Sequence, residues 1–169
     1  GVPSLALERV RLELGRTCEI TVDMFERIEK ALSIADIAAV KELVKEDDKV
    51  DILEKEIIKY LGYLRQRSLS EPQSEEHRVL MTSSIALETL ADVIEKDLVR
   101  LASNAYEVNY RSSQETIELI RELYFHVLYS IRQLVLVIRE KDMAAASRLL
   151  NEETAIREIQ QQLIIRKAE

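Results

Sequence analysis

The spacing of apolar residues along this chain predicts long helices. Apolar residues recur at steps of three and four, which places them on one face of a helix. On this basis we predict helices over about 4–33, 36–67, 75–104, 113–140 and 142–167. The polar stretch 68–74, which contains Pro72, is predicted to be a loop, and residues 105–112 a bend or short connection. The predicted fold class is therefore all-α, a helical bundle.

The chain also contains an internal repeat. Residues 36–57 read DIAAVKELVKEDDKVDILEKEI and residues 142–163 read DMAAASRLLNEETAIREIQQQL, an offset of 106 because 142 − 36 = 106. The apolar positions of the first and fourth predicted helices correspond under the same offset. We therefore predict two related three-helix units, one over about 4–108 and the other over about 110–169.

The second of these units is expected to be incomplete. The counterpart of the third helix should begin about 106 residues after Glu75, which is beyond Glu169, so the second unit is predicted to be missing its last helix. At this length we expect residues 1–169 to form a single domain.

Two predicted helices each have a face that is apolar at its ends and acidic in its middle. On the second helix this face consists of Ile37, Val40, Val44, Asp47, Asp51, Glu54, Ile58 and Leu61. On the third it consists of Met81, Ile85, Glu88, Asp92, Glu95, Val99 and Ala102. A separate apolar seam is predicted to be the main core face of the second helix: Ala39, Leu43, Val50, Leu53, Ile57, Tyr60 and Leu64. Since apolar residues flank the carboxylates, we expect the acidic seams to be buried where the helices meet.

Buried carboxylates need a cation, hydrogen-bond donors or a proton. Two acidic seams therefore predict a shared cation site, and its candidate metal ligands are Asp47, Asp51, Glu54, Glu88 and Asp92. Ligands that are all oxygen favour iron, manganese, magnesium or calcium over zinc. The alternative is a solvated face with ordinary ion pairs one helical turn apart, Asp51 with Lys55 and Asp92 with Lys96.

The second repeat does not carry the same acidic seam. Under the offset of 106, the three acidic residues of the second helix correspond to Glu153, Arg157 and Gln160. Glu153 and Arg157 are four residues apart, so the second repeat is expected to supply its own cation. A second metal cluster is therefore not predicted.

Charge and composition exclude several classes of function. A net charge of −7 and a pI near 5.1 argue against nucleic acid as a partner. Charged residues interrupt every apolar stretch before the ~18 residues that a membrane span needs. Cys18 is the single cysteine and is predicted to be a small buried hydrophobe. His77 and His126 lack a glutamate three residues earlier, and His126 is predicted to be a packed or half-exposed helix residue.

The sequence offers no catalytic constellation. It has no glycine-rich phosphate loop and no serine nucleophile motif. We therefore predict a non-enzymatic protein. Two alternatives stay open: a helical-bundle adaptor with no ligand, and an enzyme that uses metal held by the same carboxylates.

The acidic motifs carry a resemblance to a known family. The patterns Asp48-x-x-Asp51-x-x-Glu54-x-x-Ile57 and Leu87-Glu88-x-x-x-Asp92 resemble those of the PhoU-like phosphate-uptake regulators. That resemblance implies an all-helical PhoU-like bundle of duplicated three-helix units, a regulatory role in phosphate transport and metal on the acidic motifs. The opening residues 3–14, PSLALERVRLEL, are similar to the segment that follows the membrane part of bacterial sodium/phosphate cotransporters.

The resemblance also implies partners and a location. Those cotransporters end in a cytoplasmic PhoU-like domain, so we expect a membrane transporter as partner, and a cytoplasmic domain tethered to the inner face of the plasma membrane. An incomplete second repeat would leave an apolar face uncovered, from which we further expect a homo-oligomer.

Overall fold

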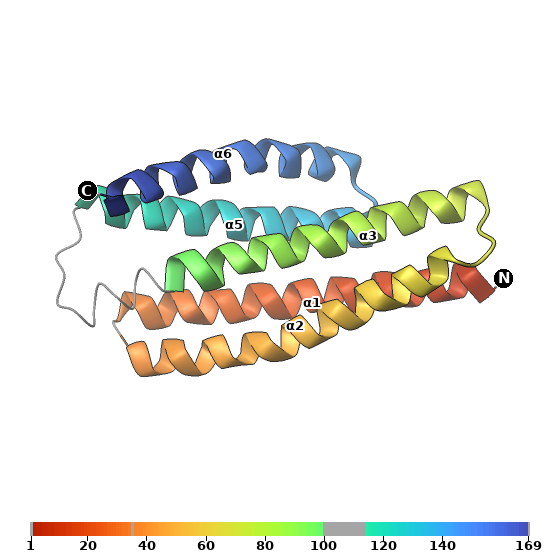
Figure 1. The fold of residues 1–169 in the computed structure, drawn as a ribbon, viewed down its shortest axis with the longest axis horizontal. Helices are drawn as coiled ribbons and strands as arrows, with labels where there is room; N and C mark the ends of the chain where they lie inside the picture. The colour runs from red at the N-terminus through yellow and green to blue at the C-terminus, as the bar shows by residue number, and fades with distance from the viewer. Residues whose placement is uncertain (1, 35, 100–113, 169) are drawn as a thin grey trace.

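The computed structural model describes residues 2–34, 36–99 and 114–168, and it is helical almost throughout (Figure 1). The helices are α1 (Val2–Ser33), α2 (Ile37–Arg65), α3 (Glu71–Asp92), α5 (Gln114–Glu140) and α6 (Met143–Ala168). A π-helical segment, η1 (Val93–Val99), continues α3 directly. The described ranges contain no strand, so the all-α prediction is confirmed. The connection predicted at 105–112 lies outside the described residues.

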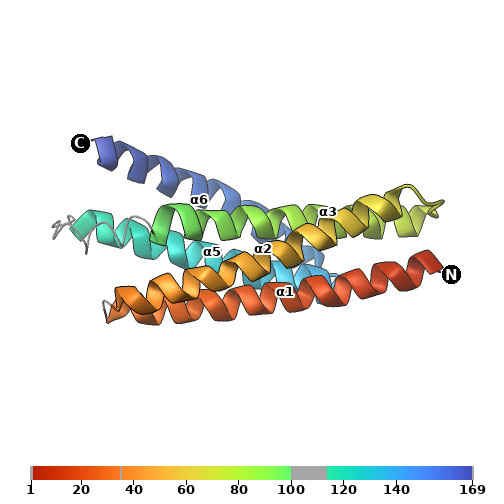
Figure 2. The same cartoon turned by 60° about the horizontal axis from the view of Figure 1, so that its bottom comes forward.

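Four helices form the body of the bundle and the fifth lies at its edge. α1 lies beside α2 and α5, and α3 packs against all three (Figure 1). α6 packs mainly against α5 and diverges from the other helices (Figure 2). As a result, one side of α6 is uncovered, with Leu150 and Ile164 each more than 60% exposed.

The core is made of the apolar faces of all these helices. Its most deeply buried side chains include Leu7, Leu14, Phe25, Ile28, Leu61, Leu80, Leu87, Ile94, Leu123 and Ile131. Cys18 is fully buried among them, as predicted, and burial raises the pKa of its thiol to about 12. A thiol that stays protonated and inaccessible is a packing group, not a nucleophile.

The offset of 106 relates two pairs of residues whose contacts the structure shows. Asp36 and Asp142 both stand just before a helix, and each side chain accepts a hydrogen bond of 3.1 Å from the amide three residues later. Glu26 of α1 and Arg132 of α5, themselves 106 apart, form an ion pair where the two helices meet. The boundaries of the two units stay predictions.

The apolar seam predicted for α2 is wrong in part. Leu53 and Tyr60 are 41% and 43% exposed. The buried positions of α2 are instead Val40, Asp47, Val50, Glu54, Ile57, Leu61 and Leu64. This stripe lies between the two predicted seams because α2 packs against α1 and α3 together. Asp47 and Glu54 are therefore among the buried positions of α2, as expected for the acidic seam.

α3 begins earlier than predicted, at Glu71. The hydroxyl of Ser70 accepts a hydrogen bond from the amide of Gln73 (3.3 Å), and the side chain of Gln73 accepts one from the amide of Ser70 (2.9 Å). This reciprocal cap satisfies two amides that the helix leaves free. Pro72, taken as a loop residue, fits the first helical turn because the amide it lacks has no partner there.

Replacing the capping serine should destabilise the protein modestly. We expect Ser70→Ala to lower the free energy of unfolding by about 1 kcal/mol, since one helix-terminal amide loses its acceptor. Urea unfolding followed by circular dichroism measures the change. Ser68→Ala, an exposed serine in the same turn, is the matched control and should leave the unfolding midpoint in place.

Candidate metal centre

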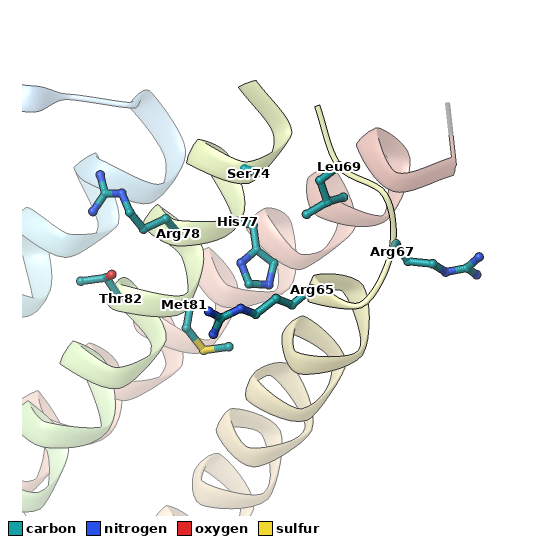
Figure 3. A pocket seen from close by; sticks show the side chains of 8 residues that line it. All are labelled: Arg65, Arg67, Leu69, Ser74, His77, Arg78, Met81 and Thr82. Carbon is teal, nitrogen blue, oxygen red and sulfur yellow. The ribbon is translucent and has the colours of Figure 1, made fainter. Parts of the chain in front are cut away.

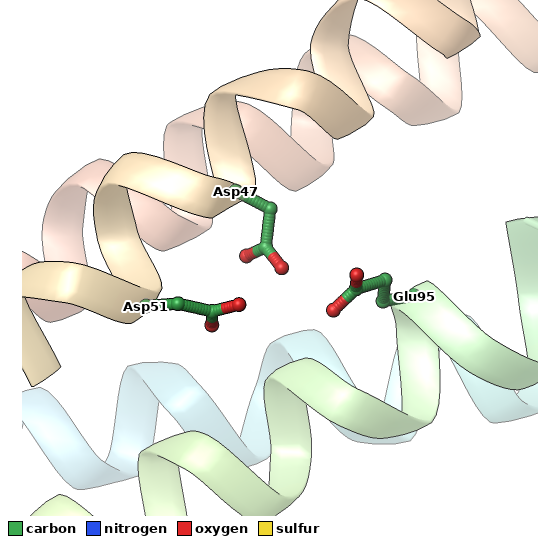
Figure 4. A group of neighbouring side chains, drawn as sticks. All are labelled: Asp47, Asp51 and Glu95. Carbon is green, nitrogen blue, oxygen red and sulfur yellow. The ribbon is translucent and has the colours of Figure 1, made fainter. Parts of the chain in front are cut away.

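Three carboxylates from two helical segments converge where α2 faces η1. Asp47 and Asp51 lie one turn apart on α2 and point toward Glu95 of η1 (Figure 4). One carboxylate oxygen from each residue lies within 4.8 Å of the other two. A hard cation holds its oxygen ligands at about 2.0–2.6 Å, so oxygens this close together can share one ion.

Two of the carboxylates on α2 are buried without hydrogen-bond donors. Asp47 is 2% exposed and Glu54 is 1% exposed. No donor among the described residues reaches any of their four carboxyl oxygens. The polar neighbour of Asp47 is the carboxyl group of Glu95, and two carboxyl groups can hydrogen-bond only if one carries a proton. The fold therefore leaves these groups to be neutralised by a proton or by a cation.

The pKa values of these groups reflect that arrangement. Burial, then contact with the Glu95 carboxyl and the charge of Asp51, raises the pKa of Asp47 to about 8. Burial, then the charge of Asp51 and of the acidic residues on α3 and η1, raises the pKa of Glu54 to about 8. The pKa of Asp51 is also raised, by burial first and then by Glu95. In the absence of a cation, the cluster therefore retains protons near neutral pH.

The five candidate ligands do not all lie in the close group. Asp47 and Asp51 belong to it, and Glu54 is buried less than one helical turn beyond Asp51 on the same face of α2. Glu88 and Asp92 of α3 are half-buried and lie outside the close group, although their charges help to raise the pKa of Glu54.

The ion pairs expected from the sequence include one at the end of α3 and one on α6, and of these two the structure shows only the first among the described residues. Asp92 forms the predicted ion pair with Lys96, at 3.6 Å. On α6, Glu153 and Arg157 are both exposed, and the described residues show no ion pair between them. The second repeat therefore has no buried acidic cluster at the corresponding positions. That difference fits the packing, because α3 covers this face of α2 and none of the described helices covers it on α6.

Glu95, which lies on the acidic seam of the third helix, is not among the ligands predicted from the sequence. In the structure, the helix changes to π geometry at Val93. A π-helical turn holds more residues than an α-helical one, so side chains after Asp92 no longer follow its α-helical face. The carboxylate of Glu95 lies beside those of Asp47 and Asp51, whereas Glu88 and Asp92 lie outside the close group.

Each of the two histidines contacts a neighbouring helix. Nε2–H of His77 donates to the carbonyl oxygen of Leu61 at 2.6 Å, which ties α3 to the end of α2. His126 is half-buried on α5 and contacts the Glu152 carboxylate of α6, as expected for a packed helix residue. The close group of carboxylates thus offers oxygen ligands alone. Such a set suits magnesium, calcium, manganese or iron.

Comparison with known proteins gives one family match and a distant relative. Residues 14–111, more than half of the chain, match the family model described as the PhoU domain. The chain is also similar to a protein of Escherichia coli O157:H7 whose name reads "Putative inorganic phosphate export protein YjbB", with 24% identity over 147 residues. The aligned region covers 87% of this chain and 27% of that relative, so the chain spans about a quarter of the relative's length. No solved structure matches the chain significantly.

Among the described helices, none combines the length and the apolar character that a bilayer crossing requires. The most apolar of them, α5, carries charged residues in both halves, among them Glu118 and Arg132.

Proposed function

This chain belongs to the PhoU family, and we propose that it is a non-enzymatic regulatory module of phosphate transport whose conformation depends on a cation held by its acidic helices. The observation that carries the cation proposal is the pair of buried carboxylates, Asp47 and Glu54, that have no donor and face further carboxylates. The phosphate-transport role is supported by the family and by the name of the E. coli relative.

The proposed ligands are Asp47, Asp51 and Glu95, with Glu54, Glu88 and Asp92 supplying further negative charge around them. A bound cation supplies the positive charge that lets these carboxylates ionise together while they remain buried. Asp47 and Asp51 would then hold α2 against η1 through a shared ion. Without it, Asp47 and Glu54 retain protons near neutral pH. Ionisation of the cluster would favour separation of α2 from η1 because like charges repel.

This arrangement gives the bundle two states that a partner could distinguish. α2 and α3 are joined by the short turn at 66–70, and η1 lies at the far end of α3. Separation at η1 would therefore splay the two helices at one end while the turn holds them at the other. We propose that this change alters the surface presented to a membrane transporter.

We propose a sodium/phosphate cotransporter or a similar transporter as that partner, and a place at the cytoplasmic face of the membrane. The similarity of residues 3–14 to the segment that follows the membrane part of such cotransporters supports this proposal. The homo-oligomer expected from the sequence stays a prediction.

Phosphate flux in cells tests the regulatory role. The substitution Asp51→Asn is made in the gene, so that cells produce the whole encoded protein with this one change. We expect it to change the rate at which cells loaded with radioactive phosphate release that phosphate. Asp51 is only half-buried, so its replacement should spare the core. Asp48→Asn removes an exposed carboxylate three residues away and is the matched control. A flux that Asp51→Asn leaves at the wild-type value would contradict a regulatory role for this site.

A further inference from the structure

A second feature lies at the opposite end of the α2–α3 pair from η1. A half-open pocket of about 480 Å³ is formed by the end of α2, the turn after it and the first turns of α3 (Figure 3). The polar side chains that line it are Arg65, Arg67, Ser74, His77, Arg78 and Thr82. The lining contains no acidic residue, although the whole chain has 31 acidic against 24 basic residues. The pocket is therefore a local concentration of positive charge on an acidic protein.

The three arginines of the pocket differ in what they already bind. Arg78 is held by Glu75, with one hydrogen bond of 3.0 Å from Nε. Arg67 lies over the ring of Tyr63, 5.4 Å from its centroid, and extends away from the pocket (Figure 3). Arg65 reaches from α2 toward α3 (Figure 3) and makes no hydrogen bond or ion pair with any described residue. Among the described residues that line the pocket, its guanidinium is therefore available to bind an anion.

The imidazole beside Arg65 has a fixed orientation. Because the carbonyl oxygen of Leu61 can only accept, Nε2 of His77 must carry the hydrogen of their 2.6 Å bond. The other ring nitrogen, Nδ1, has no hydrogen-bond partner among the described residues. With the ring hydrogen on Nε2, Nδ1 can accept a hydrogen bond, for example from the hydroxyl of hydrogen phosphate, while the ring keeps its bond to α2.

The start of α3 contributes less to anion binding than its position suggests. The amide of Gln73 is bound to Ser70 Oγ at 3.3 Å, and the amide of Ser74 is bound to the Ser70 carbonyl at 2.8 Å. The N-terminal amides that usually attract an anion are thus largely satisfied. Any ligand of the pocket would be recognised by side chains.

We propose that this pocket binds a phosphate-type oxyanion, with Arg65 as its principal ligand and Ser74, Thr82 and His77 as supporting hydrogen-bonding groups. A guanidinium presents two parallel N–H groups that match two oxygens of one phosphate group. Inorganic phosphate and the phosphate of a lipid headgroup share this chemistry. The choice of phosphate as the first anion to test rests on the proposed role in phosphate transport. The pocket itself is separate from the acidic cluster, since Arg65 follows Asp51 by 14 residues, roughly 21 Å along a helix.

Calorimetric titration with inorganic phosphate tests the pocket in the purified protein. We expect saturable binding to the wild type and binding weaker by roughly tenfold or more in Arg65→Gln, since a charge-assisted bidentate contact is lost. Arg65→Lys keeps the charge but not the paired donors, and should fall between the two. Arg121→Gln, an exposed arginine on α5, is the charge-matched control and should bind like the wild type. Equal weakening by Arg65→Gln and Arg121→Gln would overturn the proposal.

Vesicles distinguish the two sources of the phosphate group. Phosphatidylcholine vesicles with and without phosphatidylglycerol are tested for co-sedimentation with the same variants. Binding of phosphatidylglycerol vesicles that Arg65→Gln abolishes and Arg121→Gln preserves, without binding of free phosphate, would assign the pocket to a lipid headgroup. Binding of free phosphate with the same variant pattern would assign it to the inorganic ion. Absence of both would overturn the proposal.

The same titrations separate this proposal from the metal-dependent one. They are performed on chelator-treated and on manganese-loaded protein, and on Asp51→Asn. If the pocket binds phosphate and the carboxylates bind no metal, phosphate binds in the titration and manganese has no effect on the protein. If the metal site is real and the pocket is not, manganese stabilises the wild type but not Asp51→Asn, and phosphate binds to neither.

Discussion

Chelation should lower the thermal unfolding midpoint of the wild-type protein by roughly 5–10 °C relative to protein with manganese at about a hundred times its dissociation constant. The stabilisation arises because the ion binds the folded arrangement of Asp47, Asp51 and Glu95 and has no comparable site in the unfolded chain. Differential scanning calorimetry measures both midpoints. Glu95→Gln removes a ligand from the close group and should abolish the difference between them.

Two variants serve as controls for that experiment. Glu88→Gln removes a half-buried carboxylate outside the close group, so it should reduce the response to manganese less than Glu95→Gln does. Glu153→Gln changes the exposed residue of α6 that corresponds to Asp47 in the repeat, and should leave the response intact. If all three variants keep the full response, the ion binds elsewhere on the protein.

The stability of the metal-free protein should fall as the pH rises from about 4 to about 8. In the folded state the pKa values of Asp47 and Glu54 are raised to about 8, whereas ordinary carboxylates titrate near pH 4. Between these limits the folded protein holds more protons than the unfolded chain, so stability decreases with rising pH. We expect a total loss of about 2–4 kcal/mol, less than the full linkage value because parting helices admit water to the carboxylates.

Urea unfolding in the presence of chelator, repeated between about pH 5 and about pH 9, measures this dependence. The double variant Asp47→Asn, Glu54→Gln removes both titrating groups and should flatten the profile. Manganese should act in the opposite sense, because it binds the ionised carboxylates and its stabilisation grows with pH. A metal-free protein whose stability is constant over this range would show that the two carboxyl groups are solvated.

Much of the fold could be predicted because the helices follow regular periodicity. The five helices, the burial of Cys18 and the correspondence of Asp36 with Asp142 all rest on local spacing. Local spacing alone could not show which stripe of α2 is buried, because the acidic seam and the apolar seam both have helical spacing. The buried stripe is the one that faces both α1 and α3, and this packing leaves Leu53 and Tyr60 exposed to solvent.

The candidate site could be predicted only in part for the same reason. Asp47, Asp51 and Glu54 were identified because apolar residues flank them on one helix. Glu95 lies on the acidic seam predicted for the third helix, but spacing alone could not show that it, and not Glu88 or Asp92, lies beside Asp47 and Asp51. The pocket around Arg65 was missed because it is formed by the turn between two helices, and no periodic pattern describes a turn.

Anomalous X-ray diffraction from crystals grown with manganese tests the central claim most directly. The wavelength is set at the manganese absorption edge, so that the ion is located independently of the protein atoms. The account predicts one strong anomalous peak bounded by the carboxylates of Asp47, Asp51 and Glu95, at about 2.0–2.6 Å from their oxygens. Well-ordered density for all three side chains with no anomalous peak between them would contradict it, and would leave protons as the groups that neutralise the buried carboxylates.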